Sequence, residues 1–580
     1  MLDLDQRLTG GDLVARTLKA AGVTRVFALH GGHLEALFKG CVDEGVELID
    51  FRHEAAAGHA ADAYARATGN LGVCAITAGP GFTNALTAMA NAHLDASSVL
   101  FIVGAAPLRE LETNPLQGGI DQIATARPLC KWAISAPSTE RLPDLTAMAI
   151  RKAMTGRRGP VVLEVPIDVL HMSVPAAAAT KPTGLSVRPR PAPSPAEALR
   201  LVELLRAAHR PALIAGMEAA TEAAAQALRR FAEKARVPVF AKTQAFGVLP
   251  CDHPLDGGAV GNLASLPHIG VERPDLVILL GARMGLQLGG RWGAIVPDNA
   301  RVAQIYSDPA EIGRLRDVDL AIEADPAETL DAVLAAAGEA GFADYGEWPA
   351  RATTAKGLLA KAYPERDTGA GVHPYHAAAA VADAAGREAV FVTDGGEASA
   401  WASACVKVDG PGRVFSHGYL GCLGIGPGFA IGAQIAHPTR RVVHITGDGA
   451  MGFHIQELDT MVRHHLPIVT VVLNNQAWGM CIHGQQIMYG QNYNVITKLG
   501  STCYADIAGA FGCHSERVRT FDEIAPAMDR AFQSGKPALI EIMIDADVIH
   551  PVTLSMLGKV EARGDDVVLP YYENIPEGAA

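Results

Sequence analysis

The chain has 580 residues, of which 49% are hydrophobic and 19% charged, and its formal net charge is −13. These values are typical of a globular protein of roughly three domains, and the acidic balance argues against nucleic acid or a membrane as a partner. We find no apolar run of transmembrane length, no signal-peptide pattern and no C-x-x-C pair among nine cysteines, so we expect a cytoplasmic protein with reduced thiols.

Short apolar runs alternate with helical patterns along the chain. Each run is apolar throughout and ends at a glycine or a polar turn, which is typical of parallel strands covered by helices on both faces. The predicted strands are residues 73–77, 98–105, 160–165, 211–216, 275–281, 388–395, 441–449, 468–475 and 537–544. The pattern predicts an α/β fold of doubly wound parallel sheets.

Two stretches interrupt this alternation. Residues 174–198 are rich in Pro and Ala, and residues 341–373 lack strand character, so we interpret both as linkers. The predicted domains are 8–175, 196–340 and 373–550, and they are followed by a tail, 551–580. The sequence therefore predicts three doubly wound α/β domains.

A glycine-rich loop, GDGAMG, stands between a predicted strand and a predicted helix. Its G-x-G-x-x-G spacing suits close approach of a phosphate to a helix N-terminus. A dinucleotide site also needs an acidic residue at the end of the next strand, but that strand ends in Asn474 and Asn475. Asp448 inside the loop would repel a pyrophosphate unless a cation intervened. We therefore favour a diphosphate bridged by Mg²⁺ to Asp448 and Asn475 over an ordinary strand–turn–helix.

GDG followed by 24 residues and NN resembles the motif of the thiamin diphosphate (ThDP, or thiamin pyrophosphate) enzymes. The resemblance implies that Mg²⁺ is bound by the side chains of Asp448 and Asn475 and the backbone carbonyl of Ala477. It also implies that Gly449 and Ala450 contact the cofactor. The three domains would then be a pyrimidine-binding, a central and a diphosphate-binding domain.

The segment RHEAAAGHAADAYARATG resembles the family's catalytic-glutamate segment, with Glu54 at the start of a helix. A carboxylate hydrogen-bonded to the aminopyrimidine ring activates the cofactor, although a Glu at this place also favours a helix N-terminus by itself. The segment HGYLGCLGIGPG resembles the one that bends the cofactor, with Leu423 between its rings and the Gly421 carbonyl on its amino group. Core packing is the alternative for Leu423. Because Glu54 and Asp448 lie on different domains, the resemblance implies at least a homodimer, and it favours a homotetramer.

Further motifs narrow the reaction. FALHGGHLEALF places His30, Gly32 and His33 in a glycine turn after a strand, and Gln117 lies in a loop after another strand. Together with Glu54 they resemble benzaldehyde lyase, over most of the chain. His33 would shuttle a proton, because its pKa lies near working pH, and Gln117 would anchor the substrate. The alternatives are a histidine bonded to backbone and a surface glutamine. The implied activity is cleavage of 2-hydroxy ketones to aldehydes and the reverse ligation.

The predicted substrate pocket departs from that enzyme. Met480 and Gly484 replace a small residue and an aromatic one, and Ser399 replaces another aromatic residue. The tail after residue 550 would cover the active-site mouth as a lid or pack on a neighbouring subunit. These departures are compatible with 2-hydroxyacyl-CoA lyase, which gives formyl-CoA and an aldehyde or ketone.

Other activities fit the sequence less well. We place acetolactate synthase further away, because its flavin pattern is not evident at 279–293. The central domain is interpreted as a scaffold, with a degenerate nucleotide site as the alternative. A regulatory homologue without activity would have lost Glu54, Asp448 or Asn475, and all three are present.

Overall fold

The computed structural model describes residues 7–557, except Val187, Arg291, Trp292 and Ala294, and it describes side chains up to Leu554. Past helix α22 (Pro551–Leu557) it describes only the strands β21 (Val560–Arg563), β22 (Asp566–Val568) and β23 (Ile575–Pro576). Nearly half of the predicted tail therefore lies outside the described residues, and its role as a lid stays a prediction.

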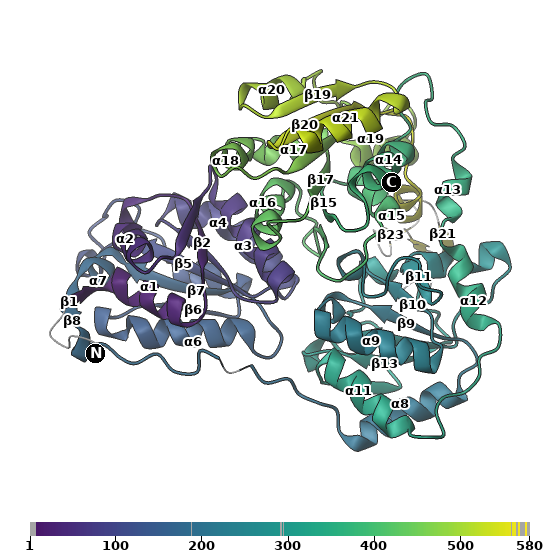
Figure 1. The fold of residues 1–580 in the computed structure, drawn as a ribbon, viewed down its shortest axis with the longest axis horizontal. Helices are drawn as coiled ribbons and strands as arrows, with labels where there is room; N and C mark the ends of the chain where they lie inside the picture. Colours follow the sequence, from purple (N-terminus) through teal and green to yellow (C-terminus); the bar gives the residue numbers. More distant parts are fainter. Residues whose placement is uncertain are drawn as a thin grey trace. The chain divides into compact units, whose positions relative to one another are not determined.

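Three six-stranded sheets form the framework, and all their strand pairs are parallel (Figure 1). All nine strands predicted from the apolar runs are present, so the predicted α/β class with three doubly wound parallel sheets is confirmed. The residues group into two compact units. Unit 1 comprises Met1–Pro189, His417–Thr439 and Phe453–Ile468, and unit 2 comprises Arg190–Ser416, Arg440–Gly452 and Val469–Ala580.

The N-terminal sheet lies in unit 1 and has the strand order β3-β2-β4-β5-β7-β6. Its strands are β2 (Arg25–Ala28), β3 (Glu47–Asp50), β4 (Gly72–Ile76), β5 (Val99–Ala105), β6 (Trp132–Ser135) and β7 (Val161–Pro166). Its main helices are α1 (Gly10–Ala20), α2 (Glu35–Asp43), α3 (Glu54–Thr68), α4 (Pro80–Leu94) and α6 (Leu142–Met154). Because successive strand residues point to opposite faces, one face packs with α1, α2 and α6, and the other, which includes Phe101, packs with α3 and α4.

The C-terminal sheet lies in unit 2 and has the order β16-β15-β17-β18-β20-β19. Its strands are β15 (Val390–Thr393), β16 (Val414–Ser416), β17 (Val442–Gly447), β18 (Val469–Asn474), β19 (His514–Val518) and β20 (Ala538–Met543). Helices α14 (Pro374–Ala385), α15 (Glu397–Cys405) and α21 (Phe521–Gln533) pack on one face, and α20 (Tyr504–Ala510) packs on the other. Numbered along the chain, this sheet and the N-terminal sheet share the order 2-1-3-4-6-5.

The shared order creates a switch point in each sheet, where the winding reverses direction. Ligands of open α/β sheets bind beside the carboxyl ends of the two strands that flank such a point. In the N-terminal sheet these are β2 and β4, and in the C-terminal sheet they are β15 and β17. The glycine turn with His33 follows β2, and the GDGAMG loop begins at the end of β17. The two predicted functional segments thus follow strands at the two switch points.

The central sheet has the order β11-β10-β9-β12-β13-β14, which is 3-2-1-4-5-6 along the chain. Its strands are β9 (Pro211–Ala215), β10 (Val239–Ala241), β11 (Asp256–Ala259), β12 (Leu276–Leu280), β13 (Arg301–Ile305) and β14 (Leu320–Ile322). Its main helices are α8 (Pro195–Ala207), α9 (Glu222–Ala235) and α11 (Pro326–Ala337). This is the strand order of dinucleotide-binding folds, although we assign no ligand to it.

The segment 341–373 is not a simple linker, as the sequence analysis had it. It contains α12 (Trp348–Ala352) and α13 (Leu358–Ala362), and Tyr345 and Trp348 belong to the core of the central sheet. The Tyr345 hydroxyl donates to the Leu205 carbonyl at 3.0 Å, and Trp348 Nε1 donates to the Pro211 carbonyl at 2.8 Å. Two aromatic side chains therefore anchor a segment whose local pattern has no strand character.

Unit 1 also contains helices from the C-terminal part of the sequence. Helix α16 (Gly426–Ala436) lies beside α3 in Figure 1, although the two are far apart in the chain. A Cβ atom on Gly428 would lie 2.6 Å from the Ala56 carbonyl oxygen, and one on Gly432 would lie 2.2 Å from that of Ala60. The two backbones therefore touch where the glycines of α16 meet the alanines of α3.

Replacing Gly432 with Ala tests this close approach. The methyl group would force the helices apart, so we expect a loss of about 1–3 kcal/mol or more of unfolding free energy and a lower unfolding temperature by calorimetry. The control is Gly261→Ala, because a Cβ at Gly261 meets no atom within 4 Å; its stability should change by less than about 0.5 kcal/mol. Equal stability of both variants would refute the tight crossing.

Two further features concern membrane-spanning helices and the cysteines. Within the described part of the chain, no helix has the length and apolar character needed to cross a membrane. All nine cysteines are free thiols.

Candidate functional site

A hydrogen-bonded group of three side chains lies at the switch point of the N-terminal sheet. Thr77, just after β4, is 8% exposed, and its hydroxyl donates to Gln117 Oε1 at 3.4 Å. The Thr77 hydroxyl oxygen also lies 3.1 Å from His33 Nδ1. Because the hydroxyl proton is directed to Gln117, the Thr77 oxygen accepts from His33 Nδ1–H, and Nε2 is left as the unprotonated nitrogen.

The surroundings of His33 favour this neutral form. Burial lowers the pKa of His33, and the positive charge of a protonated His171 lowers it further. Gly104 in β5 leaves room for the ring, since a Cβ there would lie 2.7 Å from His33 Cβ. A neutral imidazole with Nε2 unprotonated can accept a proton.

Glu54 lies beside this group. It is the first residue of α3 and 7% exposed, and its Oε2 accepts from Asn84 Nδ2 at 3.0 Å. The N-cap of α3 is His53, whose Nδ1 accepts the Ala55 amide. A Cβ on Gly81 would lie 3.4 Å from Glu54 Oε1 and 2.8 Å from the Thr77 methyl group. The Glu54 carboxylate and the Thr77 side chain thus both lie beside Gly81.

The other residues predicted from the first domain are placed differently. The His30 side chain is 67% exposed and pairs with Glu35 at 2.9 Å, so it does not join the hydrogen-bonded group of His33. Gly32 is exposed. Gln117 has a φ of +59°, which is unfavourable for a residue with a side chain. Its Cβ lies 3.0 Å from the Cβ position of Gly79, so this residue is held in a crowded turn.

The GDGAMG loop and the NN pair meet at one sheet edge, because β17 and β18 are parallel neighbours. Asp448, at the start of α17 (Asp448–His454), is 3% exposed, and burial raises the pKa of its carboxyl to about 7. The backbone amides of Gln476 and Ala477 act in the opposite direction. The Asp448 carboxylate therefore faces the loop that contains Asn475 and Ala477.

This loop suits a hard cation. Among the described residues, no three His, Cys, Asp or Glu side chains cluster as a metal site. A cation would therefore be held by mixed oxygen ligands, namely the Asp448 carboxylate, the Asn475 amide oxygen and the Ala477 carbonyl, which is the set that Mg²⁺ prefers. A buried carboxylate without a counter-charge is costly, and a bound cation would remove that cost. The residues fit Mg²⁺ with a diphosphate.

The glycines of the loop leave space on one side. A Cβ on Gly452 would meet no atom within 4 Å, whereas one on Gly449 would lie 2.5 Å from the Trp478 ring. Ala450 is 2% exposed. Its small side chain and the bare backbone at Gly449 are compatible with the close approach of a phosphate.

Gly421 and Leu423 precede α16 in unit 1, the unit that also contains Glu54. Gly421 has a φ of +66°, and its amide donates to the Gly418 carbonyl at 3.2 Å. Leu423 is half-buried. The positive φ explains the glycine at 421, and the roles of both residues toward the cofactor stay predictions.

The predicted pocket residues lie near the switch point of the C-terminal sheet. Ser399 is 4% exposed, and its hydroxyl bonds to those of Thr393 at 2.9 Å and Ser416 at 3.3 Å. Met480 and Gly484 lie on α19 (Gly479–Tyr489), and a Cβ on Gly396 after β15 would lie 3.1 Å from Met480 Cβ. The Ser399 hydroxyl is thus engaged within the domain, and Met480 faces the loop after β15.

A buried ion pair between Glu397 and His483 was not predicted from the sequence. Glu397 Oε2 lies 2.8 Å from His483 Nδ1, and His483 Nε2 lies 2.8 Å from the Ala546 carbonyl. Since neither a carboxylate nor a carbonyl oxygen donates, both ring nitrogens must carry protons, so His483 is an imidazolium. Burial opposes this charge, but Glu397 and the Ala546 carbonyl together raise the pKa of His483.

Glu397 also reaches the start of the C-terminal segment. Its Oε1 accepts from the Thr553 hydroxyl at 2.5 Å and from the His550 amide at 3.3 Å. The pair therefore ties α15 and α19 to the residues around 546–553. In the sequence, Glu397 follows the residues DGG and His483 stands six residues after Ala477. Neither pattern reveals a partner 86 positions away.

The comparisons with known proteins identify the family of the chain. Residues 8–125, 199–333 and 394–542 match the N-terminal TPP binding domain, the central domain and the C-terminal TPP binding domain of the thiamine pyrophosphate enzymes. Each matched range lies inside one predicted domain. The chain belongs to the thiamin pyrophosphate enzymes, and it is a ThDP-dependent enzyme.

Its relatives narrow this class. The acetolactate synthase large subunit IlvG of Mycobacterium tuberculosis is 35% identical over 94% of this chain and 97% of its own length. Acetolactate synthase isozyme 2 large subunit of Escherichia coli is 30% identical, covering 93% and 96%. The human 2-hydroxyacyl-CoA lyase 2 is 30% identical, covering 92% and 90%. These relatives do not support the sequence-based order that put benzaldehyde lyase first and acetolactate synthase further away.

The buried ion pair predicts a pH-dependent stability. The pKa of His483 is raised in the folded state. Its contribution to the unfolding free energy is therefore fully present below the unfolded pKa and is lost as the pH rises through the folded pKa. His483→Gln should cost about 3–5 kcal/mol near pH 6, because it leaves a buried charge unpaired, and less in alkaline solution. Thermal unfolding of both proteins across pH measures this difference.

The control is His514→Gln, which removes a more exposed His–Glu pair with Glu516 and should cost less than about 1 kcal/mol. A difference between wild type and His483→Gln that stayed constant across pH would contradict a charged His483.

Proposed function

We propose that this chain is a ThDP- and Mg²⁺-dependent carbon–carbon lyase for 2-hydroxy carbonyl compounds, which also ligates aldehydes in reverse. The observation that carries the proposal is the His33–Thr77–Gln117 group beside Glu54. Breaking the carbon–carbon bond of a 2-hydroxy carbonyl compound requires an unprotonated base that removes the hydroxyl proton. Loss of CO₂ from a 2-oxo acid does not require one.

Each side chain of the group has a distinct task in this proposal. His33 Nε2 accepts the hydroxyl proton, because Nδ1 is engaged with Thr77. The Gln117 Oε1 is occupied by Thr77, so its amide N–H groups are left to donate to a substrate oxygen. Glu54 holds the proton that the aminopyrimidine of the cofactor exchanges. When bound, ThDP supplies a nucleophilic carbon that adds to the carbonyl and accepts the electrons of the broken bond.

A second group of residues, in unit 2, would bind the cofactor. Asp448, Asn475 and the Ala477 carbonyl would hold Mg²⁺, and Gly449 and Ala450 would contact the diphosphate. Leu423 and the Gly421 carbonyl would set the cofactor's shape, as the family resemblance implies. A homodimer or homotetramer in the cytoplasm is part of the same proposal.

The proposal allows two classes of substrate. The lyase relative supports a 2-hydroxyacyl-CoA, while the resemblance to benzaldehyde lyase supports a 2-hydroxy ketone. Acetolactate synthesis from pyruvate is the second candidate function, because acetolactate synthases are among the relatives at 35% identity. Met480, Gly484 and Ser399 would determine which acyl group fits.

A product assay on protein reconstituted with ThDP and Mg²⁺ tests the proposal. The substrates are benzoin, an aliphatic 2-hydroxy ketone, a 2-hydroxyacyl-CoA and pyruvate, each with a cofactor-free control. We expect an aldehyde from a ketone or from the thioester, the latter with formyl-CoA, and a loss of about 10²-fold or more in His33→Ala. Acetolactate from pyruvate without cleavage of the other three would replace the proposal with the second candidate.

Removal of the Asp448 side chain tests the metal site. Asp448→Ala should raise the Mg²⁺ concentration needed for half-maximal activity by at least about 10-fold, because one of the oxygen ligands is lost. The control is Asp506→Ala, an exposed aspartate on α20, which should leave the Mg²⁺ titration unchanged. Identical titrations of Asp448→Ala and wild type would remove Asp448 from the metal site.

A further inference from the structure

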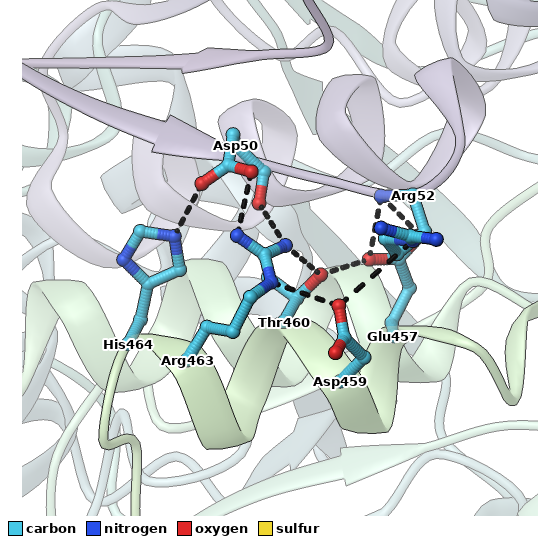
Figure 2. A network of polar contacts seen from close by, with 7 residues as sticks. All are labelled: Asp50, Arg52, Glu457, Asp459, Thr460, Arg463 and His464. Atoms are coloured by element: carbon cyan, nitrogen blue, oxygen red, sulfur yellow. Dashed lines mark hydrogen bonds and ion pairs between the residues drawn. The ribbon is translucent and has the colours of Figure 1, made fainter. Parts of the chain in front are cut away.

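Glu54 is presented by a short segment, residues 50–53, that joins β3 to α3. Helix α18 (Glu457–Arg463) and the residue after it hold this segment through several polar contacts, as Figure 2 shows. Both partners belong to unit 1. The polar groups of α18 are therefore placed to act on the backbone immediately before Glu54.

The central contact is made by Glu457, which is fully buried. Both of its carboxylate oxygens lie 3.2 Å from the Arg52 amide nitrogen, and the His53 amide also contributes to holding the charge. The Thr460 hydroxyl donates to Oε2 at 2.6 Å. Amides that precede a helix have no partner within it, so Glu457 supplies the acceptor that the start of α3 lacks.

A second set of contacts fixes Asp50, the last residue of β3. Arg463 Nη1 donates to Asp50 Oδ2 at 2.6 Å, and Arg463 Nη2 donates to the Asp50 carbonyl at 3.1 Å. His464 Nε2 lies 3.0 Å from Asp50 Oδ1. These contacts are partly exposed to solvent and individually weak, whereas the hydrogen bond from the Arg52 amide to the buried Glu457 carboxylate is charge-assisted and stronger.

The position of Glu457 has a cost that calls for an explanation. Burial raises the pKa of its carboxyl to about 7, and the Thr460 hydroxyl, the two amides and Arg463 only partly oppose this. A leucine or methionine at this place would avoid the cost and fill the same space. The property that distinguishes the Glu457 carboxylate from such an apolar side chain is that it accepts hydrogen bonds from backbone amides.

We propose that Glu457 is a positioning residue that holds the Arg52 amide and thereby fixes the Glu54 carboxylate. This inference rests on the proposed function, because it assumes that Glu54 activates the cofactor. Arg52 stands only two residues before Glu54, so a shift of its backbone is transmitted to the carboxylate. A displacement of about 1 Å in a catalytic group costs on the order of 10²-fold in rate.

The first experiment measures the step that Glu54 performs. Glu457→Gln keeps the size of the side chain, but its amide group has a single acceptor oxygen and brings N–H donors toward the two backbone amides. We expect exchange of the C2 proton of bound ThDP with D₂O, followed by NMR after acid quench, to slow by about 10–100-fold, with an equal fall in kcat. ThDP affinity, KM and unfolding temperature should change little.

The matched control is Glu218→Gln in the central domain. Glu218 likewise accepts a backbone amide, that of Ser307 at 3.1 Å, together with the hydroxyl of the same residue. It should leave C2 exchange and kcat unchanged. Wild-type exchange in Glu457→Gln would overturn the proposal, and so would an equal loss in Glu218→Gln, because a general packing defect would then explain both.

A double-mutant cycle separates positioning from a merely structural role. Glu54→Gln should lose most C2 exchange, and adding Glu457→Gln should cause no further loss, since Glu457 acts through Glu54. Independent, multiplied losses would overturn the proposal. If Glu457→Gln does not fold, Glu457→Asp keeps the charge but shortens the reach to the amides, and it should show the same exchange defect; normal exchange in a folded Glu457→Asp would overturn the proposal.

The same measurements distinguish a failure of the proposed function from a failure of the role of Glu457. Failure of the wild type to bind ThDP, or full turnover by Glu54→Gln, would refute the proposed function itself. Normal behaviour of those two proteins together with an unaffected Glu457→Gln would refute only the role of Glu457.

Discussion

The backbone contact between α3 and α16 is the constraint on which the architecture of unit 1 depends. Gly428 and Gly432 lie so close to the carbonyls of Ala56 and Ala60 that no side chain fits between them. Arg66 of α3 adds a buried anchor: its guanidinium binds Asp62 through two bonds of 2.7 Å and lies 5.1 Å from the centre of the Phe429 ring on α16. Glu54 begins α3 and Leu423 precedes α16, so both inherit the geometry of this crossing.

The repeated strand order places the chemistry. In the N-terminal and C-terminal sheets alike, the winding reverses between the first and third strands, which is where open α/β sheets bind ligands. One switch point is followed by a base with a defined tautomer, His33, and the other by a buried carboxylate, Asp448. The sheet supplies rigid strand ends, while short glycine-containing turns let the side chains and backbone approach a cofactor. The same topology thus serves two different halves of the chemistry.

Several features were predictable because they follow from local patterns. Buried parallel strands are continuous apolar runs, so all nine predicted strands appear. Parallel strands share one carboxyl edge, so Asp448 and Asn475 could be assigned to the same place before any contact was known. The segment 341–373 was misinterpreted because Tyr345 and Trp348 pack through isolated aromatic side chains, which leave no periodic signal. The relation to particular lyases and synthases was misjudged because short pocket motifs weigh little against identity over the whole chain.

The sequence by itself determined the α/β class, the three sheets and the ThDP family, since each depends on short-range patterns or on motif spacing. Only the tertiary structure decided how the functional side chains are held. The tautomer of His33 depends on Thr77 and Gln117, the charge of His483 depends on Glu397, and the backbone before Glu54 depends on Glu457. Arg52 and Glu457 are 405 positions apart. Such pairings are set by tertiary packing between distant segments within one unit, and no local pattern encodes them.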